Sequence, residues 1–160
     1  ASWMIRRGMI TPIYIYRDPR DALLSAFEYG KRKRESGRSG PFSDLMTIDM
    51  AIDFMREYIR ISDSWLACEQ ALHARYEDLL LDYDTQAERL VGFLDLDQHD
   101  LGVKTVLDQY RPSQGSSQGK GTHFVKGKIG RYRDMLNSEQ QARCVDDFGP
   151  YLERMNYPIP

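Results

Sequence analysis

The order of apolar and polar positions predicts a chain in which short strands alternate with helices. Residues 10–16 are β-branched and aromatic, which indicates a buried strand, and residues 72–76 form a second short run of this kind. Apolar residues recur with helical spacing in five further segments. These segments are residues 19–33, about 47–69, 84–94, 99–108 and 138–148. Together the elements favour an α/β fold with a parallel sheet flanked by helices.

The junction after the first strand carries several helix-start signals. Asp18 is a good N-cap residue, Pro19 suits the first helical position, and Asp21 follows three residues after the cap. A strand that ends at Tyr16 therefore places Arg17 at the carboxyl edge of the sheet. Open α/β sheets bind their ligands at this edge.

Length and composition fit one soluble globular domain of 160 residues, with 41% hydrophobic and 29% charged residues. The net charge of −2 argues against a general nucleic-acid binder. No apolar run approaches the roughly 20 residues that a membrane-spanning helix needs. Cys68 and Cys144 are too few for a disulfide framework and are expected to be buried thiols. This pattern fits a reducing compartment, and we expect a cytoplasmic protein.

Arg17 is the first candidate binding residue. The start of a helix presents unpaired N–H groups and the positive end of its dipole, and a guanidinium fork suits phosphate. These features predict an anion site. The alternative is that Arg17 pairs with a carboxylate and that Arg20 is solvated.

Lys126, Gly127 and Lys128 form the second candidate, because a glycine lets the backbone approach a ligand closely between two cations. The alternative is a solvated basic turn. Residues 115–122, GSSQGKGT, lack the spacing of a P-loop and are expected to form a loop. Five cations within residues 31–38 suit the end of a helix through its dipole, or alternatively an acidic partner. The three histidines do not have metal-ligand spacing, so no metal is expected.

Three stretches in order resemble the sulfotransferases that use 3′-phosphoadenosine 5′-phosphosulfate (PAPS). YIYRDPRDALLSAF resembles the motif for the 3′-phosphate, which implies that Arg17 and Ser25 hold this phosphate. HARYEDLLLDYDTQAERLVGFLDLD implies that Tyr76 lies beside the nucleotide. FVKGKIGRYRDM implies that Lys126 and Gly127 close over the 3′-phosphate. The alternatives are that Ser25 bonds back to a helix carbonyl and that Tyr76 is a packed aromatic residue.

The resemblance implies a P-loop NTPase-like sulfotransferase fold that is N-terminally incomplete, with residues 1–160 as the C-terminal portion of a single domain. It implies transfer of a sulfuryl group from PAPS to a hydroxyl or amine of a small-molecule, carbohydrate or peptide acceptor, releasing 3′,5′-bisphosphoadenosine (PAP). The catalytic groups are expected upstream of Ala1, so this chain alone is predicted to be inactive. Val125 stands where the family usually has Arg, and Arg131 and Tyr132 replace Asp-Trp.

Two interpretations of other classes remain open. One is a non-catalytic, degenerate module that binds a nucleotide or a protein. The other is a helical interaction domain that uses residues 31–38 against an acidic partner. Neither the acceptor nor the oligomeric state can be inferred from the sequence.

Overall fold

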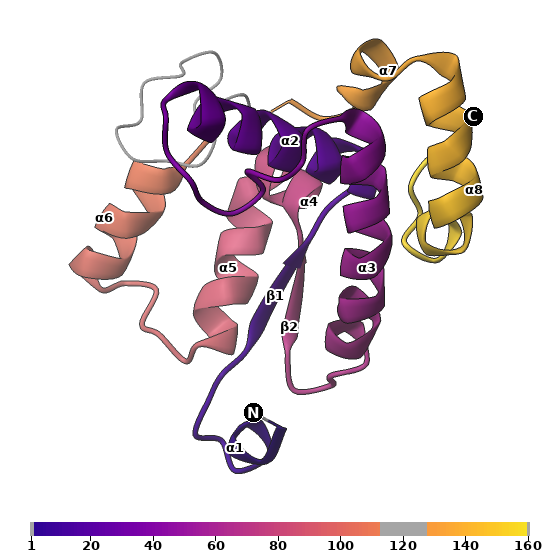
Figure 1. The fold of residues 1–160 in the computed structure, drawn as a ribbon. Helices are drawn as coiled ribbons and strands as arrows, with labels where there is room; N and C mark the ends of the chain where they lie inside the picture. The colour runs from indigo at the N-terminus through magenta and orange to yellow at the C-terminus, as the bar shows by residue number, and fades with distance from the viewer. Residues whose placement is uncertain (1, 113–127, 160) are drawn as a thin grey trace. The chain divides into compact units, whose positions relative to one another are not determined.

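The computed structural model of the protein describes residues 2–112 and 128–159 (Figure 1). The helices and strands in these ranges are α1 (Ser2–Arg6), β1 (Ile13–Tyr16), α2 (Pro19–Glu35), α3 (Ile48–Leu66), β2 (Leu72–Arg75), α4 (Tyr76–Leu81), α5 (Tyr83–Phe93), α6 (Leu101–Tyr110), α7 (Tyr132–Met135) and α8 (Ser138–Arg154). The chain divides into two compact units. The first comprises Ala1–Tyr16 and Trp65–Lys128, and the second comprises Arg17–Ser64 and Ile129–Pro160. In the described ranges, no helix has the length and apolar character that crossing a membrane requires.

The first unit contains a parallel sheet of two strands. Ile13 pairs with Leu72 and Tyr16 with Arg75, so both strands end at the same edge (Figure 1). Parallel strands together with helices confirm the predicted α/β class in this general form. The strand is shorter than the predicted residues 10–16, and one reason is that Pro12 cannot donate an N–H to a neighbouring strand.

The prediction that the first strand is buried is wrong for one of its faces. Side chains alternate between the two faces of a strand. Ile13 and Ile15 share a face and are exposed, whereas Tyr14 and Tyr16 on the other face are half-buried. The Tyr14 ring stacks on Trp65, with 6.1 Å between the ring centroids, so aromatic packing holds the covered face.

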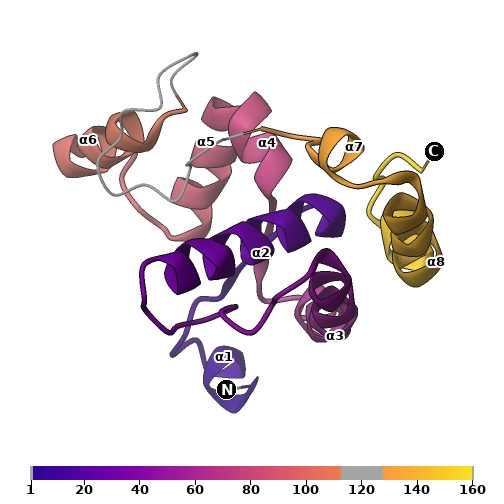
Figure 2. The ribbon, with the colours of Figure 1, turned by 45° about the horizontal axis from the view of Figure 1, so that its top comes forward.

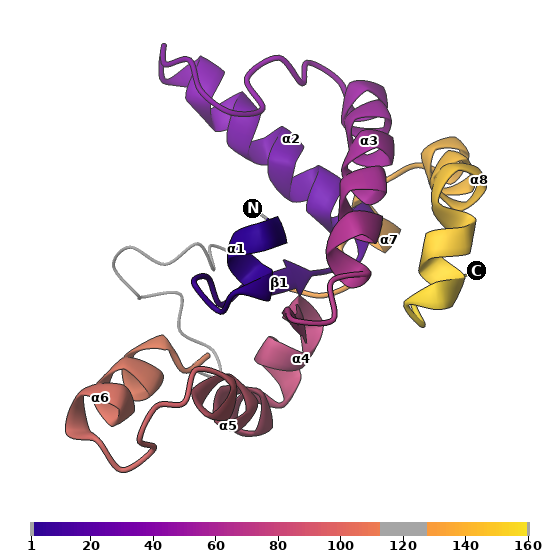
Figure 3. The ribbon, with the colours of Figure 1, turned by 90° about the horizontal axis from the view of Figure 1, so that it is seen from below.

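The first unit also contains α1, α4, α5 and α6, and of these α5 and α6 lie beside each other (Figure 3). The Tyr83 hydroxyl donates to the Leu107 carbonyl oxygen at 2.7 Å, which joins the two helices. Asp100 caps α6 by accepting from the N–H groups of Gly102 and Val103. Both helices were predicted, with ends that differ by one or two residues. Helix α4, which begins directly at the end of β2, was not.

Helices α2, α3 and α8 provide most of the core of the second unit (Figure 2). The apolar side chains from these helices with an exposure of 5% or less are Leu23, Leu24, Ala51, Ile52, Met55, Cys144, Phe148, Tyr151 and Leu152. Across the surface of α3 and α8, Arg143 pairs with Asp49 and Asp53 at 3.0 and 2.6 Å, and Arg56 pairs with Asp147 at 2.8 Å. Exposed pairs of this kind contribute about 0.2–1 kcal/mol each, so the apolar core dominates the stability.

Helix α8 is longer than predicted. Its start is as expected, because Asn137 and Gln140 form a capping box. The prediction that the helix ends near Phe148, before Pro150, is wrong, since the helix continues to Arg154. Pro150 removes one backbone donor, but Tyr151 and Leu152 beyond it are buried in the core. Tertiary packing therefore outweighs the local signal.

The two cysteines differ, and the expectation that both are buried is correct only for Cys144. Cys144 is fully buried in α8, and burial raises the pKa of its thiol to about 12. Cys68 lies in the turn after α3 and is only half-buried. Because of its high pKa, the Cys144 thiol stays protonated near neutral pH and has little reactivity.

Gly30 in α2 gives a stability prediction, because a Cβ at this position would lie 1.9 Å from the carbonyl oxygen of Phe42. We expect Gly30→Ala to lower the free energy of unfolding by about 1–3 kcal/mol, since backbone must move to relieve the clash. Gly92→Ala in α5 is the matched control, because nothing beyond its chain neighbours lies within 4 Å of its Cβ and no proline follows it. That variant should gain about 0.5–1 kcal/mol from helix propensity. Urea unfolding followed by circular dichroism measures both, and a Gly30→Ala protein as stable as wild type would contradict the prediction.

Candidate functional site

The candidate site is built on the turn between β1 and α2. Strand β1 ends at Tyr16 and α2 begins at Pro19, so Arg17 directly follows the carboxyl end of a parallel strand, as predicted. The side chain of Asp18 accepts a hydrogen bond from the Arg20 N–H at 2.9 Å, which confirms Asp18 as the N-cap. The position of Arg17 is thus fixed by local sequence signals.

The expectation that the helix start offers unpaired N–H groups is wrong for residues 19–22. Pro19 has no N–H, and the Arg20 N–H is held by the Asp18 side chain. The N–H groups of Asp21 and Ala22 both donate to the Asp18 carbonyl oxygen, at 3.1 and 2.9 Å. An anion at this turn would therefore be bound by side chains rather than by these backbone groups.

The side chain of Arg17, which precedes α2, contacts Ser25 in the second turn of this helix. The guanidinium Nη1 of Arg17 donates to the Ser25 hydroxyl at 3.2 Å. The Ser25 hydroxyl in turn donates to the Asp21 carbonyl oxygen at 3.1 Å, so the predicted alternative of a back-bonded serine is also correct. A hydroxyl can rotate its single proton to a new acceptor. The pair therefore combines the permanent positive charge of Arg17 with a Ser25 hydroxyl that can donate to either of two acceptors.

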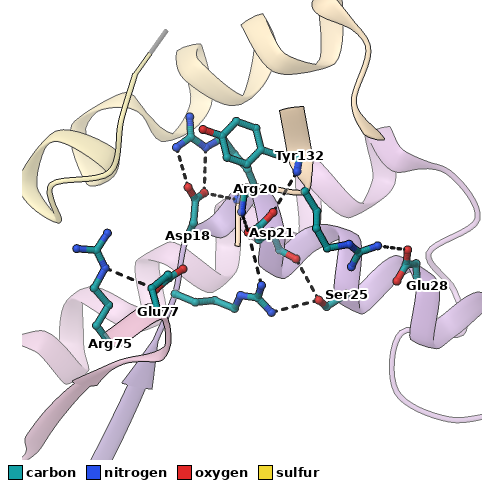
Figure 4. A network of polar contacts seen from close by, with 11 residues as sticks. Asp18, Arg20, Asp21, Ser25, Glu28, Arg75, Glu77 and Tyr132 are labelled. Atoms are coloured by element: carbon teal, nitrogen blue, oxygen red, sulfur yellow. Dashed lines mark hydrogen bonds and ion pairs between the residues drawn. The ribbon is translucent and has the colours of Figure 1, made fainter. Parts of the chain in front are cut away.

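Asp21 lies beneath this pair and is almost fully buried, at 1% relative exposure. Its Oδ2 is 3.7 Å from Arg17 Nη2, so the alternative in which Arg17 pairs with a carboxylate is also correct. Its two carboxylate oxygens accept hydrogen bonds from the N–H groups of Gly130 and Tyr132, at 2.6 and 3.1 Å (Figure 4). The local sequence pattern indicates only a helix-start role for Asp21, because these contacts come from residues 109 and 111 positions away.

Arg20 is buried at 1% exposure, so the expectation that it is solvated is wrong. Its Nε and Nη2 donate to the two carboxylate oxygens of Asp18 at 2.9 and 2.7 Å, and Nη2 also donates to the Pro158 carbonyl oxygen at 2.9 Å. The guanidinium lies 4.0 Å from the centre of the Tyr132 ring (Figure 4). Burial opposes the charged form, but the hydrogen bond and charge of Asp18 raise the pKa of Arg20 above its usual value. Arg20 is thus a structural residue.

The segment after the second candidate stretch approaches α2 within the second unit. Arg131 forms a short hydrogen-bonded ion pair with Glu28, and Tyr132 is buried beside Arg20. Burial also raises the pKa of the Tyr132 hydroxyl. Lys126 and Gly127 lie outside the described residues, so their predicted roles stay predictions.

Tyr76 belongs to the first unit, where it is the first residue of α4 immediately after β2. It is half-buried. Its neighbours form an ion pair, with Arg75 Nε 3.5 Å from Glu77 Oε2 (Figure 4). The strand thus ends one residue earlier than the predicted residues 72–76, so Tyr76 directly follows the strand, and its role beside a nucleotide stays a prediction.

Comparison with known proteins decides the family. The family described as "Sulfotransferase domain" matches residues 7–156, which is nearly the whole chain. The chain belongs to this family. The match confirms the resemblance on which the sulfotransferase hypothesis was based. No curated protein and no solved structure matches the chain.

Arg131 and Tyr132, two residues that depart from the sulfotransferase pattern, each contact another side chain in the structure. Arg131 binds Glu28, and Tyr132 packs against Arg20. Within residues 2–112 and 128–159, no three His, Cys, Asp or Glu side chains are arranged to hold a metal ion.

Proposed function

We propose that this sulfotransferase domain binds PAPS and PAP through their 3′-phosphate, and that Arg17 and Ser25 hold this phosphate. The observation that carries the proposal is the Arg17–Ser25 hydrogen bond at the start of α2, in a chain of the sulfotransferase family. A phosphate dianion only accepts hydrogen bonds, and this pair supplies two donors of matching character. The Arg17 side chain keeps 21% of its surface exposed, so a ligand can reach it.

The positive charge of Arg17 favours an anionic ligand over a neutral one. Asp21 lies 3.7 Å from Arg17, but its carboxylate oxygens also accept from the N–H groups of Gly130 and Tyr132, so Arg17 is not its only source of compensation. On binding, the Ser25 proton would turn from the Asp21 carbonyl oxygen to a phosphate oxygen. Arg17 would meet the phosphate with its planar fork, which binds two oxygens at once.

The remaining roles in the proposal come from the family resemblance. Tyr76 would lie beside the nucleotide, and Lys126 and Gly127 would close over the 3′-phosphate. In the reaction, the acceptor oxygen or nitrogen forms a bond to sulfur, while the bond from sulfur to the 5′-phosphate oxygen breaks. PAP leaves, and the acceptor proton passes to a base. This chain supplies the nucleotide-anchoring half of the site in a P-loop NTPase-like fold, and the acceptor is a hydroxyl or amine on a small molecule, carbohydrate or peptide.

Calorimetric titration of the chain with PAP and with adenosine 5′-monophosphate (AMP) tests the proposal, because AMP lacks only the 3′-phosphate. We expect PAP to bind more tightly than AMP. Equal affinity, or no binding of PAP, would overturn the assignment of the 3′-phosphate site. Incubation with PAPS and phenol, alcohol and amine acceptors tests catalysis by this chain alone. We expect no turnover, and measurable turnover would show that the chain itself holds the catalytic groups.

A further inference from the structure

Asp21 is a buried carboxylate that contacts two segments of the second unit at once. A charged group inside a protein is stable only when hydrogen bonds and opposite charges compensate for the lost water. At 1% exposure, Asp21 obtains this compensation from the N–H groups of Gly130 and Tyr132 and from the guanidinium of Arg17. Compensation of one charge by separate segments makes the positions of these segments depend on one another.

The first link leads to the phosphate-binding pair of the proposed function. Arg17 approaches the Asp21 carboxylate at 3.7 Å, and Ser25 donates to the Asp21 carbonyl oxygen at 3.1 Å. Both members of the pair therefore contact the same residue, one through its side chain and one through its backbone. Asp21 lies in the first turn of α2, where the helix dipole favours a negative charge.

The second link leads to the segment that follows Lys126 and Gly127. Gly130 has a φ of +77°, a conformation that favours glycine. The turn at residues 130–132 presents two N–H groups to the two oxygens of one carboxylate, and the shorter of these hydrogen bonds is 2.6 Å. These contacts join residues 109 and 111 positions apart.

We propose that Asp21 is a positioning residue that couples the Arg17–Ser25 pair to the segment at residues 130–132, so that preference for a 3′-phosphate depends on its carboxylate. This inference rests on the proposed function. An asparagine at this position keeps the shape but replaces one acceptor oxygen by an NH₂ group, which cannot accept a hydrogen bond. One backbone N–H would then lose its partner, and Arg17 would lose the charge that orients it.

The test compares Asp21→Asn with Glu28→Gln in calorimetric titrations with PAP and AMP. Glu28 is the matched control because its carboxylate also ties α2 to this segment, through Arg131. We expect Asp21→Asn to lower the ratio of the AMP and PAP dissociation constants by roughly tenfold, as loss of a partner that orients a ligating side chain does at metal sites. Glu28→Gln should leave the ratio within about twofold. An unchanged ratio in Asp21→Asn, or an equal loss in both variants, overturns the proposal.

A measurement on the wild-type chain keeps the proposal testable if the Asp21→Asn variant does not fold. Because coupling between sites is reciprocal, PAP binding should slow hydrogen exchange at the Gly130 and Tyr132 amides. AMP should slow it less. Unchanged exchange at both amides with PAP bound would overturn the coupling. A wild-type chain that does not prefer PAP to AMP would instead show that the proposed function itself is wrong. The proposed dependence on Asp21 would then be wrong as well.

Discussion

Replacement of Arg20 by methionine is expected to lower the free energy of unfolding by about 3–5 kcal/mol, the usual cost of breaking a buried ion pair by removing one partner. Arg20 is 1% exposed and donates two hydrogen bonds to Asp18. Methionine has a similar length and retains apolar contact with Tyr132, so the loss of the charge dominates. The variant leaves the buried carboxylate of Asp18 without its main compensation.

A double-mutant cycle identifies the source of this loss. Asp18→Asn removes the charge of the partner, and asparagine is itself a good N-cap. If the uncompensated Asp18 charge causes the loss in Arg20→Met, then Asp18→Asn/Arg20→Met should be more stable than the sum of the single variants predicts, by about 1–3 kcal/mol. Additive effects in the cycle would contradict this explanation.

The surface residue Arg60 provides the control for loss of positive charge alone. Its side chain is 76% exposed and pairs with Glu57 at 3.1 Å in the same helix. Because such exposed pairs contribute little, Arg60→Ala should change the free energy of unfolding by less than about 1 kcal/mol. Urea unfolding monitored by circular dichroism measures the wild type and all four variants. A loss in Arg20→Met no larger than that in Arg60→Ala would show that Arg20 is not a structural anchor.

Local signals were sufficient to predict the position of Arg17 from the sequence. A β-branched run followed by Asp18 and Pro19 fixes both the end of β1 and the start of α2. Ser25 follows Arg17 by eight residues, about two helical turns, and the structure joins the two side chains by a hydrogen bond. The start of α8 at its capping box was predictable for the same reason.

The contacts that could not be predicted join residues far apart in the sequence. Arg20 donates to Pro158, 138 positions away, and Asp21 accepts from Gly130 and Tyr132. Nothing in the first turn of α2 indicates which carboxylate or carbonyl a second segment will bring to it. The local pattern therefore favoured a solvated Arg20, and tertiary burial reversed that interpretation. The run of α8 past Pro150 is a further case in which packing outweighs a local rule.

A test of Arg17 needs a control variant that removes a positive charge without unfolding the protein. Because Arg20 is a buried anchor, Arg20→Ala would confound binding with unfolding and is a poor comparison for Arg17. Arg60→Ala is better suited, since it removes one exposed positive charge from the same unit. Any effect of overall charge on nucleotide affinity should appear in this variant as well as in Arg17→Ala.

Arg17→Ala is expected to weaken PAP binding about 10- to 100-fold, because a hydrogen bond to a charged group contributes roughly 1.5–3 kcal/mol and 1.4 kcal/mol corresponds to a tenfold change. The protein should remain folded, since Asp21 keeps its hydrogen bonds from Gly130 and Tyr132 when Arg17 is removed. Affinity for AMP should change by less than about threefold, within the range of an exposed charge contact. The effect is thus specific to the 3′-phosphate.

Arg17→Lys refines this prediction. Lysine keeps the positive charge but lacks the planar fork, so it should recover only part of the lost affinity. Calorimetric titration of wild type, Arg17→Ala, Arg17→Lys and Arg60→Ala with PAP and AMP measures these effects on one scale. If Arg17→Ala weakens PAP and AMP equally, Arg17 has a structural role through Asp21 and Ser25 rather than a role in holding the 3′-phosphate. If Arg17→Lys binds PAP as tightly as wild type, the site requires only a point charge, and the bidentate geometry is wrong.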